Sequence, residues 1–100
     1  MTGQYLVTLA APPALEESIV DWLLQFGSQT GFTSQAVHGH SSREEGLSLA
    51  EQVAGRKRQV RFQLHIDAEE WPRFIEQLKR DFTGAGLHYW LVPVIESGHL

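Results

Sequence analysis

The sequence contains no cysteine among its 100 residues. This absence excludes a disulfide framework, a thiolate metal site and a cysteine nucleophile, and it fits a reducing compartment. Long apolar runs are also missing: no stretch approaches the roughly 18 residues of a membrane-spanning helix, and no basic region followed by an apolar one opens the chain. We therefore expect a soluble cytoplasmic protein without direct membrane insertion.

Basic side chains are few, and the formal net charge of −4 gives no general attraction to nucleic acid or to an anionic membrane. The sequence also lacks a nucleophile elbow, a phosphate-binding P-loop, a zinc-protease motif and a dinucleotide-binding fingerprint. The turn AAPPA before the first expected helix contains two prolines, which remove backbone donors and argue against an acylphosphatase-like anion cradle. We expect no enzymatic activity.

Apolar patterning predicts four strands and two helices. Strands are expected over residues 5–10, 32–37, 59–66 and 87–95, and the third alternates most regularly. Helical spacing of apolar residues predicts two helices, the second of them broken by Gly84 and Gly86. Asp67 with Glu70 has the spacing of a capping box before this second helix. The two stripes are Leu15, Ile19, Trp22, Leu23 and Phe26, and Trp71, Phe74, Ile75, Leu78 and Phe82.

The order β-α-β-β-α-β predicts a ferredoxin-like α+β fold in a single domain, residues 1–100. Right-handed crossovers place both helices on one face of a four-stranded antiparallel sheet with strand order 4-1-3-2. The uncovered face then carries Arg61, Gln63 and His65, which either meet water or become buried in an oligomer.

Residues 39–55, between the second and third strands, are far longer than the usual hairpin loop of about 2 to 5 residues. Such a connection is either functional or a solvated excursion. His38 and His40, two residues apart on an extended chain, point to the same side and could share a divalent ion such as Zn, Cu or Co, with His65 as a further ligand. The alternative is a pair of exposed or hydrogen-bonded histidines at a strand end.

Arg56, Lys57 and Arg58 form a basic run directly after Gly55. Guanidinium and ammonium groups together suit a phosphate or a carboxylate, so a small anionic effector is one expectation. The other is a solvated strand entrance that discourages edge pairing. We expect no nucleic-acid partner, because no RNA-recognition aromatic signature accompanies the run.

The stretch from GFTSQAVHGHSSREEG to QVAGRKRQVRFQLHI, with the ending LHYWLVPVIESG, resembles the PII signalling proteins. In that family a glycine-centred turn opens a long T-loop and a basic segment begins the next strand. The chain is still more similar to a small, poorly characterised PII-like family often found beside heavy-metal efflux transporters.

The resemblance implies a homotrimer with inward-facing sheets, ligand sites in clefts between subunits and a regulatory loop at residues 39–55 that acts on a partner, such as an efflux transporter. Binding of ATP in the PII manner is not expected, because the PII phosphate loop is reduced here to TGAGLH and the C-terminal arginines are missing. A metal-binding accessory protein of heavy-metal efflux, using His38 and His40, is the alternative function. The ligand-binding candidates carried over or suggested by charge are Gly39, Ser41, Arg43, Arg56, Lys57 and Arg58.

Overall fold

The computed structural model describes residues 3–26, 31–40 and 56–100. Strand β1 (Gln4–Ala11) leads through a short 3-10 helix, η1 (Pro13–Leu15), into helix α1 (Glu16–Gln25). Strands β2 (Thr33–His40) and β3 (Arg56–Asp67) follow, and helix α3 (Trp71–Phe82) and strand β4 (His88–Val94) complete the fold.

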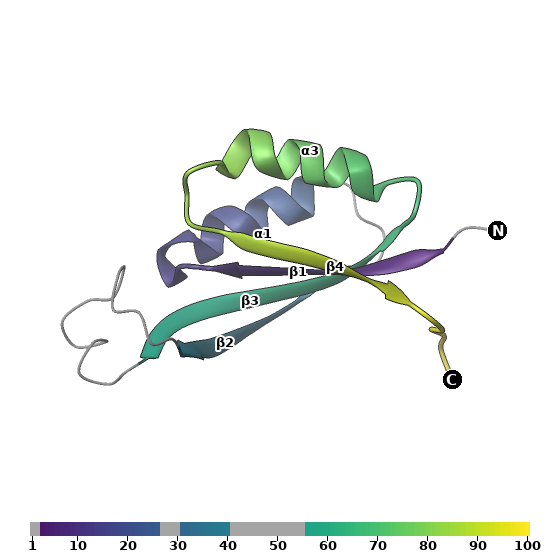
Figure 1. Ribbon diagram of the computed structural model, residues 1–100, viewed down its shortest axis with the longest axis horizontal. Coiled ribbons are helices and arrows are strands. Elements are labelled where there is room, and N and C mark those ends of the chain that lie inside the picture. Colours follow the sequence, from purple (N-terminus) through teal and green to yellow (C-terminus); the bar gives the residue numbers. More distant parts are fainter. Residues whose placement is uncertain (1–2, 27–30, 41–55) are drawn as a thin grey trace.

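The four strands form one antiparallel sheet in the order β2-β3-β1-β4. Both helices lie on the same side of it (Figure 1). This arrangement confirms the ferredoxin-like fold and the strand order 4-1-3-2 expected from the sequence. Strand β4 lies at an edge, where Pro93 is tolerated because one side of the strand needs no donors for the ladder.

The core lies between the sheet and the helices. Strand β3 alternates as expected, with four buried apolar side chains beneath the helices and Arg61, Gln63 and His65 on the opposite side. Trp22 of α1 packs edge-on against Phe74 of α3, with ring centroids 5.2 Å apart. The buried apolar residues are Val7, Leu9, Ala10, Ala11, Ile19, Leu23, Val60, Phe62, Leu64, Ile66, Phe74, Ile75 and Leu78.

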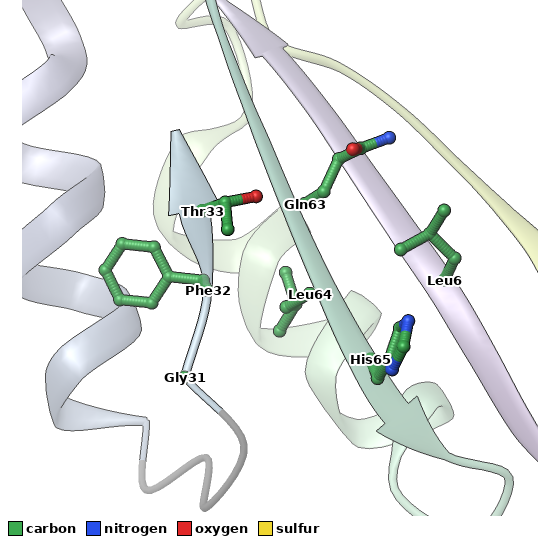
Figure 2. A pocket seen from close by; sticks show the side chains of 7 residues that line it. All are labelled: Leu6, Gly31, Phe32, Thr33, Gln63, Leu64 and His65. Atoms are coloured by element: carbon green, nitrogen blue, oxygen red, sulfur yellow. The ribbon is translucent and has the colours of Figure 1, made fainter. Parts of the chain in front are cut away.

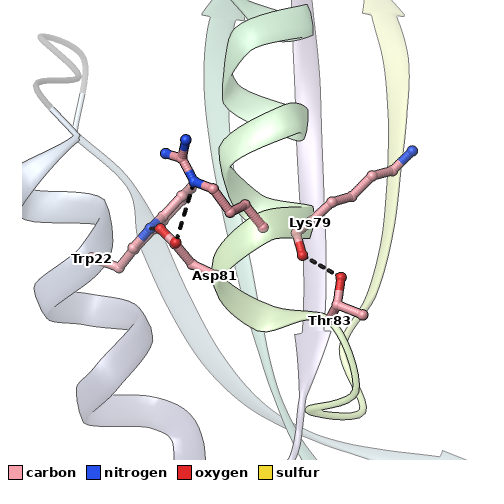
Figure 3. A network of polar contacts seen from close by, with 5 residues as sticks. Trp22, Lys79, Asp81 and Thr83 are labelled. Atoms are coloured by element: carbon pink, nitrogen blue, oxygen red, sulfur yellow. Dashed lines mark hydrogen bonds and ion pairs between the residues drawn. The ribbon is translucent and has the colours of Figure 1, made fainter.

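Polar contacts fix the C-terminal end of α3 (Figure 3). The indole Nε1 of Trp22 donates to Oδ2 of Asp81 over 2.7 Å and so ties α1 to α3. The hydroxyl and the backbone N–H of Thr83 both donate to the carbonyl of Lys79, so the side chain reinforces the last backbone hydrogen bond of the helix. Gly84, with a φ of 84°, then reverses the chain in a left-handed conformation that favours glycine, as expected for the end of this helix.

The expected capping box at the start of α3 is wrong. Glu70 occupies the N-cap position and makes no side-chain capping hydrogen bond. Asp67 belongs to β3, where it pairs with Gln4 and accepts a hydrogen bond from that side chain over 3.4 Å. The pairing of β1 with β3 extends to Gln4, the first residue of β1, so Asp67 opposite it remains in the sheet. Helix α3 therefore begins later, at Trp71.

The expected strand ends around residues 39–55 are also wrong, since β2 runs to His40 and β3 begins at Arg56. Gly39 therefore lies in β2 and not in the connection, and Arg56, Lys57 and Arg58 form the first residues of β3. Backbone hydrogen bonds extend β2 and β3 into residues whose side chains do not alternate between apolar and polar. The sequence pattern therefore does not indicate that these residues pair.

Candidate functional site

Strands β2 and β3 continue as a two-stranded ribbon beyond the rest of the sheet. Strand β1 pairs with β3 only as far as Val60, opposite Ala11, whereas β2 and β3 remain paired until Arg56 meets His40. Figure 1 shows the paired ends of β2 and β3 running away from the layer of helices. We call residues 37–40 and 56–59 the basic ribbon.

Two histidines and two arginines share one side of the basic ribbon. His38 lies opposite Arg58 and His40 lies opposite Arg56 in the ladder, and all four side chains are exposed. Residues that face each other across two strands point to the same side, and alternate residues of one strand do too. The four side chains therefore form a polar patch that continues the helix-covered side of the sheet.

This patch suits an anion better than a divalent cation. Each imidazole is paired directly with an arginine, whose permanent positive charge disfavours a metal ion nearby and favours a phosphate or carboxylate. Among residues 3–26, 31–40 and 56–100, no three potential metal ligands come together. The arrangement supplies charge and hydrogen-bond donors, which can bind an anion.

His65 does not join His38 and His40 within one chain. It pairs with Leu6 and alternates with the buried residues of β3, so it lies on the side of the sheet away from the helices, which we call the open face. His38, in contrast, has the parity of Val60 and lies on the other side. The expected three-histidine set is therefore divided between the two faces.

Gly39 is closely approached by a side chain and does not form a turn. A Cβ atom built on it would lie 2.7 Å from Oε1 of Gln59, and its φ is not positive. The Gln59 side chain thus crosses the open side of the ribbon through the space that the glycine leaves. Of the other residues expected at this site, Lys57 lies opposite Gly39, while Ser41 and Arg43 fall outside the described residues.

The open face combines hydrogen-bonded polar groups with exposed apolar ones. Nη2 of Arg61 donates to Oε1 of Gln35 over 2.8 Å, and Nε2 of Gln63 donates to Oγ1 of Thr8 over 3.2 Å. Thr8 is only 1% exposed although it lies on this face. Trp90 pairs with Thr8, so it also lies on this face, and it is 47% exposed.

A small hollow of about 140 Å³ lies between the end of α3 and β4, and sequence reasoning missed it. Lys79 and Tyr89 contribute to its lining, with Nζ of Lys79 at 5.9 Å from the centroid of the tyrosine ring. The rest of the lining is mostly apolar. The only indication of this hollow in the sequence was a lysine in the last turn of the helix. A lysine at that position usually interacts only with the negative end of the helix dipole, so it did not predict the hollow.

The ferredoxin-like sheet, its open face and the long β2–β3 connection together define a PII-like fold. The chain belongs to the DUF3240 family, described as a protein of unknown function, and the match covers residues 1–100. No curated protein matches this chain in sequence. No helix among the described residues is long and apolar enough to cross a membrane.

Solved structures share this fold at low sequence identity. A DUF3240 family protein from Shewanella baltica has a TM-score of 0.78 and 21% identity, over 100% of this chain and 99% of that one. A putative PII-like signaling protein from Thermus thermophilus has a TM-score of 0.66 and 20% identity, over 92% and 87% of the two chains. The GlnK–ATP complex of B. subtilis has a TM-score of 0.67 and 14% identity, over 92% and 82%.

Proposed function

We propose that this chain is a non-enzymatic PII-like regulatory protein. It assembles as a homotrimer through the open face and binds a small anionic effector in clefts between subunits. The observation that carries the proposal is the basic ribbon, which holds Arg56 and Arg58 on one side, beyond the part of the sheet that the helices cover. The fold shared with PII-like signalling proteins supports the same function class.

Charge explains why the ligand would be an anion. Guanidinium groups bind phosphate and carboxylate through two parallel hydrogen bonds, and a cleft between subunits would strengthen these bonds by excluding water. The effector is not proposed to be ATP held as in PII, because residues 83–87 contain no lysine. A compact anion such as phosphate or a small carboxylate fits better.

Residues 41–55 connect the two strands of the ribbon, so a ligand on the ribbon lies next to this connection. We propose that a partner protein detects the bound ligand through this segment. The resemblance to PII-like proteins encoded near heavy-metal efflux systems makes an efflux transporter the first partner to test. Such signalling requires only that the ligand prefers one of two states of the connection.

The test combines mass measurement with titration calorimetry. Light scattering should give three times the chain mass, and a monomer would reject the subunit clefts. Phosphate, citrate, ADP and ATP are then titrated into the wild type and the Arg56→Gln/Arg58→Gln variant. The variant should lose at least about tenfold in affinity for the anion that binds best, because charge-assisted hydrogen bonds are removed.

The matched control is Arg73→Gln/Arg80→Gln, which removes the same charge from helix α3. It should change the affinity by less than about twofold if the ribbon holds the ligand, since distant exposed charges are screened. Equal losses in the two variants would show that only net charge matters, and that result would reject the ribbon as the site.

A further inference from the structure

The open face contains a hollow of about 420 Å³ where β2 begins. Strand β2 starts at Thr33, opposite Gln63, while β3 continues to Asp67 without β2 beside it. Figure 2 shows Thr33, Gln63 and His65 around this step, with Leu6 of β1 on the far side. The hollow therefore combines an aliphatic surface with hydroxyl, amide and imidazole groups.

The opposite edge of the same face carries a protruding apolar pair. Trp90 and Val92 of β4 are 47% and 45% exposed, and both point to the open side because they pair with Thr8 and Leu6. Isolated exposed apolar residues are ordinary, but a tryptophan next to a valine on a sheet face is typical of protein interfaces.

The hollow and Trp90 lie at the same level of the sheet. Thr33 pairs with Gln63, Gln63 pairs with Thr8, and Thr8 pairs with Trp90, so these four residues form one row across the strands. Three strand spacings separate the ends of the row, about 14 Å. Trp90 is thus too far from Thr33, on the β2 side of the hollow, to contact it within its own chain.

In a cyclic oligomer, one edge of each subunit can contact the opposite edge of the next subunit. Rotation about a symmetry axis preserves height along that axis, so an axis running along the strands keeps all copies of this row at one level. A projection at one edge and a hollow at the other form a head-to-tail contact, which closes into a ring when the rotation allows it. The two features are complementary on identical copies.

We propose that Trp90 of one copy inserts into the hollow of the next copy, at Leu6, Thr33, Gln63 and His65. The indole ring covers Leu6, and its N–H donates to one of the acceptors that the polar side chains provide. This inference rests on the proposed oligomer and adds the contact that would hold it together.

The test uses two variants that damage opposite partners of the contact. Trp90→Ala removes the projection, Thr33→Arg fills the hollow, and Asp21→Ala on the exposed side of α1 is the control. Light scattering and sedimentation over a dilution series should show a rise of at least about tenfold in the subunit dissociation constant for the first two only. A mixture of the two variants should form heterodimers, because one intact contact remains between them.

A second measurement, disulfide cross-linking, tests the contact without relying on substitutions that could also disturb the packing of the subunit itself. The wild type has no cysteine, so Thr33→Cys/Trp90→Cys introduces the only two thiols, which are too far apart to bridge within a chain. Oxidation should give covalent dimers and trimers, whereas Asp21→Cys/Trp90→Cys should give neither above the level of its single-cysteine variants. The contact is wrong if Trp90→Ala and Thr33→Arg keep the wild-type mass, or if neither heterodimers nor cross-links form. A monomeric wild type would instead reject the oligomer itself, and with it the function proposed above.

Discussion

Replacing Gly39 by alanine tests the close approach inside the basic ribbon. The added Cβ would lie 2.7 Å from Oε1 and 3.3 Å from Cδ of Gln59, while the next nearest atom, the carbonyl oxygen of Lys57, is 3.8 Å away. Only the glutamine side chain therefore has to move. Since that atom ends a flexible side chain, we expect the Gln59 side chain to leave its present conformation at a cost of about 0.5–1.5 kcal/mol.

Alanine also brings a gain at this position. The φ of Gly39 is not positive, so alanine adopts the backbone without strain and lowers the entropy of the unfolded chain, which stabilises the fold by about 0.4–1 kcal/mol. The two effects nearly cancel, and Gly39→Ala alone should destabilise by about 0–1 kcal/mol. In a Gln59→Ala background the cost disappears, so the same substitution should stabilise by about 0.4–1 kcal/mol.

The assay is a double-mutant cycle from urea unfolding, with all four proteins at one concentration because association contributes to apparent stability. The expected coupling between the two positions is about 1 kcal/mol, or roughly 4–8 °C in Tm for a domain of this size. A Gly39→Ala effect of the same sign and size in both backgrounds would refute the proposed reason for the glycine.

Two further predictions concern the core and the histidines. Phe74→Leu should lower the free energy of unfolding by about 1–2 kcal/mol, because the fully buried ring contacts Phe26 and Trp22 edge-on. Thermal melting compares this variant with Phe82→Leu, which changes a half-buried position. An equal decrease in Tm for the two variants would contradict the reasoning. Titration of Zn, Cu and Co should give the same weak affinity for the wild type and for His38→Ala/His40→Ala, because the arginines opposite disfavour a cation. A tenfold difference would instead support the metal-binding alternative.

The fold could be predicted because the spacing of apolar residues along the sequence indicates which side chains are buried. Val60, Phe62 and Leu64 alternate with polar residues, and burial of one face of β3 explains both sets. The spacing of Ile19 and Leu23, or of Phe74 and Leu78, likewise follows from helices packed on one side of a sheet.

The site was harder to predict because it depends on strand register. Nothing in the sequence shows that His38 lies opposite Arg58, or that His65 belongs to the other face, since polar residues on a ribbon give no apolar signal for pairing. Asp67 is a case in which the sequence pattern indicates a local structure that does not form. Its spacing to Glu70 fits a helix cap, but pairing with Gln4 keeps it in the sheet. The row from Thr33 to Trp90 appears only once three strand registers are known.

The described ends of the chain lie at the same end of the molecule, away from the basic ribbon (Figure 1). Oγ of Ser97 donates to Oε1 of Gln4 over 3.0 Å, which ties the segment after β4 to the start of β1. An affinity tag or a fluorescent reporter attached at either terminus would therefore point away from the ribbon. Immobilised in that way, the protein would present its charged patch to the surrounding solution, and candidate ligands or partner proteins could be screened without obstruction by the support.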